Sequence, residues 1–453
     1  MARQFDLIAL GTGSAAAAAA YRCRAAGWQV AVVDSRPFGG TCALRGCDPK
    51  KVLVGAADLV DWSRRMQGKG VGAGGLAIDW PALMRFKRTF TGPVPQHREQ
   101  RFLEAGIVPF HGRARFLDEH TVQVGDDPAN VLTARYVLVA TGMQPAHLGI
   151  AGEEWLTTSE QFLELDDLPR RIAFVGGGYI SFEFAHVAAR AGAQVEILHR
   201  GERPLTGFDP DLVARLVQGT RDLGITVRLG TAVHSLERRD GRLLVHCATA
   251  EGEYACEADL VVHGAGRVPE IADLALDRAH VRYERRGVTV NEFLQSVSNP
   301  AVYAAGDSAA SPGLPLTPVA SLEGEVAAAN MLEGNHRQPD YTGIPTVVYT
   351  IPPLAAVGLS ESAAQAQRLR FRVHQEDTSD WYSTRRVAMP YAAFKVLIEE
   401  GSGHILGAHL LGPHADETIN LFGLAMRKGL TAADLEEMPY AYPTSASDVW
   451  YMV

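Results

Sequence analysis

Two cysteines lie five residues apart in a glycine-rich stretch, and two lysines follow them. The run reads Gly39-Gly40-Thr41-Cys42-Ala43-Leu44-Arg45-Gly46-Cys47-Asp48-Pro49-Lys50-Lys51, in a chain with five cysteines in all. An ideal helix rises about 7.5 Å over five residues, which exceeds the roughly 7 Å limit on the Cα separation in a disulfide. A bond between Cys42 and Cys47 therefore requires a break in the helix, and Gly46 permits one.

Two interpretations of this cysteine pair are open from the residues alone. A small ring closed by a disulfide in a cytosolic protein is more readily a redox couple than a structural cross-link. The alternative is a pair of buried thiols beside a surface turn. Either way, this stretch is the part of the chain whose residue types are most suited to sulfur chemistry.

The N-terminal segment has the pattern of a nucleotide-binding unit. An apolar run from Phe5 to Leu10 leads into a G-x-G-x-x-A turn that starts at Gly11, and alanines then continue to about Ala26. A second apolar run, 30–33, ends at Asp34. We predict a βαβ unit whose helix N-terminus and backbone amides face a pyrophosphate, with Asp34 placed to bind ribose hydroxyls.

The same pattern recurs in the middle of the chain. An apolar run at 171–175 precedes Gly176-Gly177-Gly178, a helical segment continues to Ala191, and another apolar run follows at 195–198. The interval from Gly11 to Gly27 equals that from Gly176 to Gly192. One glycine fingerprint is weak, but two in matching register strongly indicate two dinucleotide sites and hence two cofactors.

The two copies differ at the position that selects the cofactor. Counted from the first glycine, the equivalent of Asp34 is His199, with Arg200 next to it and Arg203 nearby. A carboxylate binds a free ribose 2′-hydroxyl, whereas a cation favours a 2′-phosphate. The second site therefore predicts NADPH over NADH. The alternative is that the two arginines are merely exposed.

These stretches resemble the flavoprotein disulfide reductases, the family of glutathione reductase, dihydrolipoamide dehydrogenase and mercuric reductase. The cysteine run matches the signature GGTCxxxGCxPKK nearly letter for letter. Residues 136–142 resemble the ATG strand of the FAD domain, 264–269 the G-R-x-P return from the nicotinamide domain, and 303–307 the second FAD signature. The resemblance covers essentially the whole chain.

The resemblance implies an α/β fold with two Rossmann-like dinucleotide-binding domains, for FAD and NAD(P), and a C-terminal α+β interface domain. We expect FAD to bind residues 1–150 and 269–337, NAD(P)H to bind 151–268, and residues 338–453 to mediate dimerisation. Strands are expected at 393–399 and 405–411, and helices at 414–428 and 432–436. The implied assembly is a homodimer in which the C-terminal tail completes the partner's active site.

The implied activity is that of an FAD-dependent NADPH:disulfide oxidoreductase. Hydride passes from NADPH through FAD to the Cys42–Cys47 disulfide, and the electrons then reach a small-molecule disulfide or related thiol substrate. Cys42 attacks the substrate while Cys47 lies nearer the flavin, so a lowered thiol pKa is expected at the pair. Lys50 lies by the flavin and pairs with Glu183, and Tyr442 occupies the acid–base position.

The resemblance also implies two sets of cofactor-binding residues. Those expected to bind FAD are Gly11, Gly13, Ser14, Asp34, Gly40, Thr41, Lys50, Ala114, Thr141, Gly142, Arg267, Asp307 and Thr317. Those expected to bind NADP are Gly176, Gly178, Tyr179, Ile180, His199, Arg200, Arg203 and Gly266.

The C-terminal segment departs from the family pattern H-P-T-x-x-E. Here it reads Tyr442-Pro443-Thr444-Ser445-Ala446-Ser447-Asp448, so a tyrosine replaces the histidine and a serine the glutamate. A tyrosine with a pKa of about 10 is a poor base at neutral pH, which disfavours a dihydrolipoamide dehydrogenase-like activity. Mercuric reductase shares the tyrosine but has a C-terminal cysteine pair that this chain lacks. A metal-ion reductase therefore remains an alternative activity. NADH also remains an alternative electron donor, slower than NADPH.

Composition narrows the possible partners. The net charge is −9 with both signs dispersed along 453 residues, which gives no electrostatic case for nucleic acid or an anionic membrane. No apolar run reaches the length of a membrane span, so we expect a cytoplasmic protein. The histidines are scattered without ligand spacing, and we predict no metal site.

Overall fold

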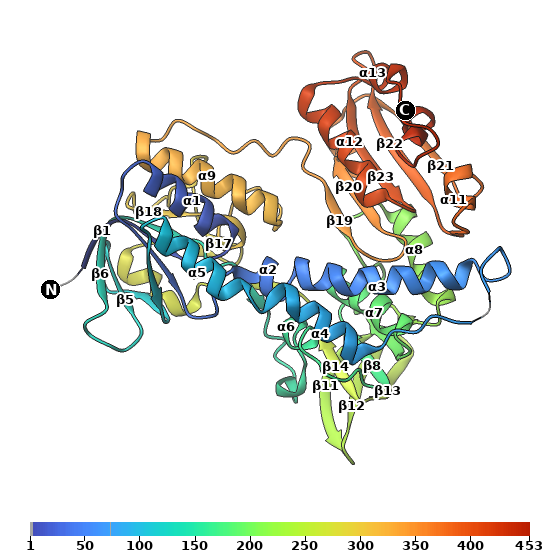
Figure 1. Ribbon diagram of the computed structural model, residues 1–453, viewed down its shortest axis with the longest axis horizontal. Coiled ribbons are helices and arrows are strands. Elements are labelled where there is room, and N and C mark those ends of the chain that lie inside the picture. Colours follow the sequence, from blue (N-terminus) through green and yellow to red (C-terminus); the bar gives the residue numbers. More distant parts are fainter. Residues whose placement is uncertain (1–2, 73) are drawn as a thin grey trace. The chain divides into compact units, whose positions relative to one another are not determined.

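The computed structural model describes residues 3–72 and 74–453 (Figure 1). The chain divides into two compact units, each built from three segments. Unit 1 comprises Met1–Pro49, Phe86–Ala146 and Arg267–Tyr341. Unit 2 comprises Lys50–Arg85, His147–Gly266 and Thr342–Val453. Residues 50–85 lie within the segment predicted to form the first part of the FAD-binding domain, but they group with unit 2.

Unit 1 is built on a mostly parallel sheet with the strand order β3-β2-β1-β6-β5-β4, in which β18 also pairs with β6. Strands β1, β2, β3, β6 and β18 are parallel, whereas β5 and β4 are antiparallel. The strands are β1 (Arg3–Leu10), β2 (Val30–Asp34), β3 (Val108–His111), β4 (Ala114–Phe116), β5 (Thr121–Val124), β6 (Val131–Val139) and β18 (Val302–Ala304).

Two helices with small side chains pack together on this sheet. They are α1 (Ser14–Ala25) and α9 (Thr317–Glu333), which lie side by side in Figure 1. A Cβ atom on Gly324 would lie 2.3 Å from the backbone oxygen of Ala15, so the two backbones cross too closely for any larger residue. The buried alanines of α1 belong to the same apolar core as β1 and β2. This packing places the first turn of α1 at the carboxyl ends of the parallel strands.

The half of unit 2 that contains the second predicted nucleotide turn repeats this arrangement on a smaller sheet. Its four parallel strands have the order β10-β9-β8-β14. They are β8 (Arg171–Val175), β9 (Gln194–Leu198), β10 (Thr226–Arg228) and β14 (Leu260–His263), with the antiparallel strands β11 (Ala232–Arg239), β12 (Arg242–Thr249) and β13 (Gly252–Ala258) beside them. Helices α3 (Cys47–Arg65), α7 (Tyr179–Arg190) and α8 (Pro210–Asp222) contribute to one core, because apolar side chains of all three occur in the same buried cluster.

The C-terminal part of unit 2 is an antiparallel sheet with the strand order β19-β20-β23-β22-β21. Its elements are β19 (Thr346–Val348), β20 (Leu354–Gly358), β21 (Phe371–Asp377), β22 (Ala393–Glu399), β23 (Ile405–Leu411), α12 (Ala415–Lys428) and α13 (Ala432–Glu437). The predicted strands 393–399 and 405–411 are confirmed. Helix α12 begins one residue later than predicted, because His414 has a left-handed φ of 59°.

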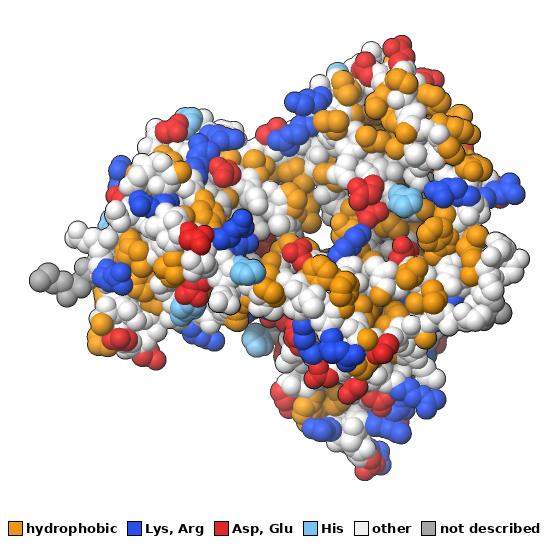
Figure 2. Space-filling model, in the orientation of Figure 1, with side chains coloured by type: hydrophobic (Ala, Val, Ile, Leu, Met, Phe, Trp, Pro, Cys, Tyr) orange, Lys and Arg blue, Asp and Glu red, His pale blue; other side chains and the backbone are white. Residues whose placement is uncertain are grey.

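The remaining α-helices and β-strands are α2 (Gly40–Arg45), α4 (Trp80–Thr91), α5 (Val94–Glu104), α6 (Ser159–Phe162), α10 (Glu361–Ala366), α11 (Tyr382–Arg385), β7 (Met143–Pro145), β15 (Arg267–Pro269), β16 (Tyr283–Glu284) and β17 (Gly287–Val288). Within the described residues, no helix is both long and apolar enough to cross a membrane. Figure 2 shows acidic and basic side chains interspersed on the face that it presents.

Candidate active site

The helix breaks between the two cysteines, as their spacing predicts. Helix α2 ends at Arg45, and Gly46, with φ −143° and ψ −111°, separates it from α3, which begins at Cys47. A Cβ atom on Gly46 would lie 3.0 Å from the backbone oxygen of Thr41, a tight contact that glycine avoids. Both cysteines are reduced in the structure, with no disulfide between them.

The two sulfurs share the Thr317 hydroxyl as a neighbour, whereas Asp48 lies next to Cys42. Sγ of Cys47 lies 3.8 Å from Oγ1 of Thr317, and Sγ of Cys42 lies 3.8 Å from Oδ1 of Asp48. Cys47 is the first residue of α3, and Thr317 is the first residue of α9, whose first turn has no acidic side chain. Helix N-termini stabilise negative charge. Cys47 therefore lies at the start of α3 and near the start of α9, and the first turn of α3 also carries the carboxylate of Asp48.

The expectation of a lowered pKa is wrong for Cys42. Its hydrogen bond with Cys47, together with burial, raises the pKa of the Cys42 thiol. The physical reason is that two adjacent sulfurs share a proton, so a second ionisation would place two negative charges side by side. Nucleophilic attack by Cys42 consequently requires the pair to lose its first proton.

The first glycine turn is shaped for close approach of a phosphate group. Gly11 has φ +114°, and a Cβ atom there would lie 2.3 Å from the carbonyl oxygen of Ala140. A Cβ atom on Gly40 would lie 2.5 Å from Cα of Gly13. Gly13 is the N-cap of α1, which has no side-chain cap and no acidic residue in its first turn. The amide groups at the start of this helix, including that of Ser14, therefore fit an anion such as a pyrophosphate.

Asp34, at the end of β2, is held by hydrogen bonds from the first glycine turn. Its Oδ2 accepts hydrogen bonds from the backbone N–H of Thr12 (3.1 Å) and from the Thr12 hydroxyl (2.6 Å), and its Oδ1 accepts one from the Arg36 N–H (2.9 Å). Oγ1 of Thr12 in turn accepts a hydrogen bond from the Gly39 N–H at 3.1 Å. Sequence reasoning missed Thr12, although its place between two turn glycines marks it. Thr12 links the Asp34 carboxylate, predicted to bind ribose, to the cysteine-bearing segment.

Further predicted FAD residues of unit 1 present polar groups that suit a bound cofactor. Oγ1 of Thr141 is buried and has no hydrogen-bond partner among the described residues. Burial raises the pKa of Asp307, against the opposing charge of Arg267, whose guanidinium donates to the Met143 carbonyl at 2.6 Å. A ligand with hydroxyl groups and ring nitrogens would satisfy these groups, so the residues present fit FAD.

The remaining predicted FAD residues lie at element boundaries. Thr41 is in α2, Ala114 begins β4, and the Gly142 carbonyl accepts the Glu270 N–H at 2.9 Å. Lys50 belongs to unit 2 and is the one predicted FAD residue outside unit 1.

The second glycine turn repeats the stereochemistry of the first. Gly176 has φ +108°, and a Cβ atom there would lie 2.4 Å from the Gly264 oxygen. Gly178 is the N-cap of α7, which begins with Tyr179 and Ile180 and has no side-chain cap or acidic residue in its first turn. Gly266 also has a positive φ, +118°. The N-terminus of this helix therefore also fits a nucleotide phosphate.

At the specificity position, the positive charge comes from the arginines and not from His199. The ring of His199 lies against the backbone of Gly177, and its Nε2 is 3.1 Å from the carbonyl oxygen of Arg203. Burial, and then the charge of Arg200, lower the pKa of His199. The imidazole is consequently neutral at pH 7, whereas Arg200 and Arg203 are exposed cations next to it.

Lys50 and Glu183 form the ion pair that the resemblance implies. Nζ of Lys50 lies 2.9 Å from the Glu183 carboxylate, and the side chains are only 12% and 2% exposed. The same carboxylate accepts the backbone N–H of Tyr349 at 2.8 Å. Nζ of Lys50 also lies 4.6 Å from the centroid of the Tyr349 ring. Tyr349 carries no sequence signal for this role, because its main contact is through the backbone.

Tyr442 is exposed, with 76% of its surface accessible, and has no hydrogen-bond partner among the residues that the structure describes. Ser447, at the position of the family glutamate, donates its hydroxyl to the Thr444 carbonyl at 2.6 Å. Asp448 instead accepts a hydrogen bond from the Ser383 hydroxyl of α11, and burial raises its pKa. The segment therefore supplies no carboxylate partner to Tyr442. Among the described residues, no group of three or more His, Cys, Asp or Glu side chains is arranged to hold a metal ion.

Comparison with known proteins identifies the chain over nearly its full length. Residues 5–324 match the family model of the pyridine nucleotide-disulphide oxidoreductases, and residues 344–453 match the model of their dimerisation domain. The chain is 31% identical over 445 residues to glutathione reductase of Burkholderia cepacia, an alignment that covers 98% of this chain and 97% of that protein. It is also 31% identical over 460 residues to dihydrolipoyl dehydrogenase of Chlamydia muridarum, covering 99% of this chain and 96% of that protein.

A solved structure has the same fold. It is the Cu(II) complex of a mutant of the HOCl-induced flavoprotein disulfide reductase RclA from Escherichia coli, with a TM-score of 0.88, 23% identity, and 99% of both chains covered. The predicted fold class, two dinucleotide-binding domains and a dimerisation domain, is confirmed. Matched by its family models along both units, and carrying the cysteine pair and two nucleotide turns described above, the chain belongs to the pyridine nucleotide-disulphide oxidoreductase family and is a flavin disulfide oxidoreductase.

Proposed function

We propose that this protein is an FAD-dependent NADPH:disulfide oxidoreductase that reduces a small-molecule disulfide. The observation that carries the proposal is the order of groups on α3. Cys47 begins the helix, and Lys50, one turn later, is paired with the buried Glu183. A sulfur nucleophile and a buried amine thereby lie within one turn of each other along the sequence of α3.

The proposal assigns each cofactor to one glycine turn. FAD binds the unit 1 residues that include Gly11, Asp34 and Asp307, and NADPH binds the turn from Gly176 to Ile180. Bound FAD supplies a two-electron carrier between the nicotinamide and the cysteine pair. In this proposal the FAD-binding domain comprises residues 1–150 and 269–337, and the NADPH-binding domain comprises residues 151–268.

The sulfur chemistry balances within the cysteine pair. Two electrons and two protons convert the Cys42–Cys47 disulfide into two thiols. After the pair loses a proton, the Cys42 sulfur attacks a substrate disulfide, forms a mixed disulfide and releases one substrate thiolate. The Cys47 sulfur then attacks Cys42, re-forms the internal disulfide and releases the second thiolate.

NADPH is the proposed donor because Arg200 and Arg203 are exposed beside the neutral His199, where a ribose 2′-phosphate would extend. NADH is the weaker alternative, since no carboxylate stands at this position to bind a free 2′-hydroxyl.

A metal-ion reductase is the second candidate function. Tyr442 lacks the carboxylate partner that would assist release of a thiolate, and a soft metal ion leaving a sulfur needs no proton. The RclA structure named above is a Cu(II) complex, which supports including copper in the test. We further propose a homodimer assembled through residues 344–453, working in the reducing cytoplasm.

Anaerobic titration of the purified flavoprotein with NADPH tests the proposal. We expect two electrons to produce a long-wavelength thiolate-to-flavin absorption band. Steady-state NADPH oxidation is then compared for glutathione disulfide, an aromatic disulfide, lipoamide, Hg(II) and Cu(II). Failure of NADPH to reduce the protein would refute the proposal, and turnover with metal ions alone would favour the second candidate.

A further inference from the structure

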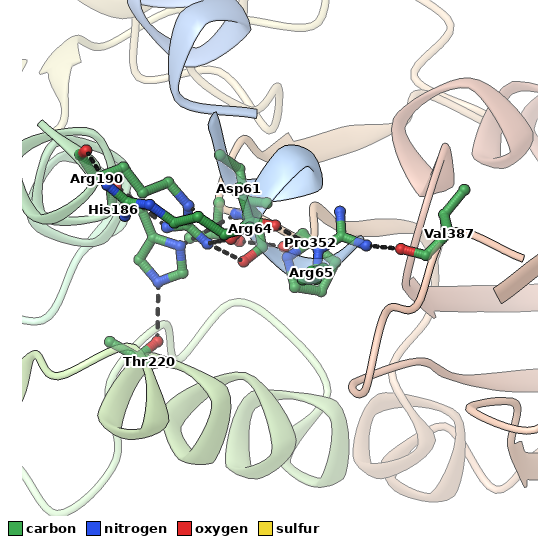
Figure 3. A network of polar contacts seen from close by, with 10 residues as sticks. Asp61, Arg64, Arg65, His186, Arg190, Thr220, Pro352 and Val387 are labelled. Carbon is green, nitrogen blue, oxygen red and sulfur yellow. Dashed lines mark hydrogen bonds and ion pairs between the residues drawn. The ribbon is translucent and has the colours of Figure 1, made fainter. Parts of the chain in front are cut away.

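A network of buried polar groups joins α3 and α7 at a second place, away from Lys50. Asp61 of α3 receives two hydrogen bonds on Oδ1 from Arg190 of α7, from Nε at 2.9 Å and from an Nη at 2.7 Å. Arg190 is 3% exposed. Oδ2 of Asp61 accepts a third hydrogen bond from Nε of Arg65, at 2.6 Å. Figure 3 shows Asp61 between the two guanidinium groups.

The network extends into the C-terminal part of unit 2. Arg65 donates to the carbonyl oxygen of Val387, and Arg190 donates to that of Ile351 at 3.2 Å. Arg64 donates to the carbonyl oxygen of Arg190 at 3.1 Å, which ties the end of α7 to α3 once more. The ion pair is therefore a junction of α3, α7 and two segments of the C-terminal sheet region.

One face of α7 carries three groups that hold the segment following β19. Glu183, His186 and Arg190 are spaced i, i+3 and i+7, so they lie on the same side of the helix. Glu183 accepts the Tyr349 N–H, Nδ1 of His186 accepts the Ile351 N–H at 3.1 Å, and Arg190 binds the Ile351 carbonyl. The residue that pairs with Lys50 is thus one member of a continuous row.

The hydrogen bonds of His186 define the protonation state of its ring. Since Nδ1 accepts a hydrogen bond, Nε2 must carry the proton that it shares with Thr220 Oγ1 at 3.0 Å. The Thr220 hydroxyl donates to the Leu216 carbonyl at 2.7 Å, which leaves its oxygen free to accept. Burial lowers the pKa of His186 well below its ordinary value, in agreement with a neutral ring.

The Asp61–Arg190 pair constrains α3 and α7 at a different height from the Lys50–Glu183 pair. Lys50 and Asp61 are eleven residues apart, about 16.5 Å along α3, and Glu183 and Arg190 are seven apart, about 10.5 Å along α7. Each pair of residues lies near one face of its helix. A single ion pair leaves two helices free to pivot about it, whereas two pairs at different heights fix both their separation and their rotation.

We propose that the Asp61–Arg190 pair is a positioning device that sets the location of the Lys50 amine through the rigid body of α3. The proposal rests on the proposed function and on the resemblance, which implies that the Lys50 amine lies by the flavin that NADPH reduces. Asp61 and Arg190 are positioning residues, since they act through α3 and α7 and not by touching a reacting atom.

The test replaces Asp61 and Arg190 together, because removing one would leave the other's charge buried and endanger folding. Arg65, whose side chain is 16% exposed, keeps its hydrogen bond to the Val387 carbonyl. The variant D61L/R190M substitutes apolar side chains of similar size. A matched control, R171M/D259N, removes the Arg171–Asp259 pair (2.7 Å), which lies in the same nucleotide-binding half but is partly exposed. A third variant, R190K, keeps the charge but loses the two-pronged hydrogen bond.

Two measurements are made on each flavoprotein. The first is the limiting rate of flavin reduction by NADPH in a stopped-flow instrument, together with the dissociation constant of NADPH. A misplacement of about 1 Å costs up to about 100-fold in rate, so we expect about a tenfold slower limiting rate in D61L/R190M, about threefold in R190K, and dissociation constants within about twofold. The second is competitive acetylation of Lys50, read by mass spectrometry, which we expect to rise at least about threefold in D61L/R190M as the amine is less well held.

A limiting rate and Lys50 labelling unchanged in folded D61L/R190M would overturn the proposal, as would an equal slowing in the R171M/D259N control. If D61L/R190M does not fold, R190K decides by the same two criteria. If NADPH fails to reduce even the unaltered protein, the proposed function is lost, and the labelling of Lys50 alone then decides whether the pair positions that amine.

Discussion

Glu323 of α9 offers a sharp test of how the second FAD segment is held. Its carboxylate is 1% exposed and accepts three hydrogen bonds, from the Gly306 N–H (2.6 Å), the Ser311 hydroxyl (2.6 Å) and the Tyr341 hydroxyl (2.7 Å). Gly306 precedes Asp307, the proposed ligand of the flavin side chain. We predict that Glu323→Ala weakens this loop severely and that Glu323→Gln weakens it slightly.

The magnitudes follow from which groups lose a partner. In Glu323→Ala, the Gly306 N–H loses its acceptor, which costs about 1–3 kcal/mol. The missing side chain also leaves a cavity. We therefore expect the free energy of unfolding to fall by about 3 kcal/mol. In Glu323→Gln, the amide oxygen can accept from Gly306 while its NH₂ group donates to the two hydroxyl oxygens. The expected loss is then about 1 kcal/mol.

Urea unfolding followed by the fluorescence of released flavin measures both values. Glu325→Gln is the control, because Glu325 is two residues away on α9, 44% exposed, and paired with Arg22 at the surface. We expect less than about 0.5 kcal/mol there. The reasoning is refuted if Glu323→Ala is as stable as the control, or if Glu323→Gln is the less stable of the two Glu323 variants.

The change of folding stability with pH provides a second, independent test of the role of Glu323. Burial raises the pKa of Glu323 above its ordinary value. The stability contributed by this group is therefore fully present below the ordinary pKa and is lost as the pH rises through the raised one. Since glutamine does not titrate, the stability advantage of the unaltered protein over Glu323→Gln should shrink as the pH rises above the ordinary glutamate pKa of about 4.3. A difference that grows with pH would contradict the assignment.

Three further predictions concern the cofactor sites. Replacing Cys42 by serine should abolish disulfide turnover but retain a long-wavelength thiolate-to-flavin band, whereas Cys47→Ser should lose the band; absorption spectra of the two variants decide. Arg200→Gln with Arg203→Gln should raise the KM for NADPH at least about tenfold and leave that for NADH within about twofold, since only a 2′-phosphate loses charged partners; initial rates with both donors measure this. Gly11→Ala should lower the flavin content at least about tenfold, because its Cβ would lie 2.3 Å from a carbonyl oxygen; the ratio of flavin to protein absorbance is the check.

Features that depend on local stereochemistry could be read from the sequence. The turns at Gly11 and Gly176 need a positive φ, the break at Gly46 follows from two cysteines five apart, and Asp34 ends a buried strand. In each case a few neighbouring residues determine the geometry, so spacing alone is informative.

Features that depend on distant partners could not be read in this way. Asp61 and Arg190 look like ordinary charges of amphipathic helices, and nothing in their spacing marks a buried pair 129 residues apart. The raised pKa of Cys42 has a similar origin, because it depends on where a second sulfur points once the helix has broken. Long-range pairing of charges is set by tertiary packing, for which a single sequence carries no periodic signal.

The structure divides the proposed reaction into a half that keeps the family's groups and a half that departs from them. Reduction of the cysteine pair would rely on the buried Lys50–Glu183 pair, and Glu183 lies on α7, which several hydrogen bonds hold in place. Release of the substrate would rely on Tyr442, which is exposed and lacks the usual carboxylate. A leaving thiolate of low pKa, or a metal ion, needs no proton at this step, whereas an aliphatic thiol of high pKa does. We therefore predict that the proton demand of the leaving group governs substrate choice, so that turnover of a panel of disulfides follows the pKa of their thiols.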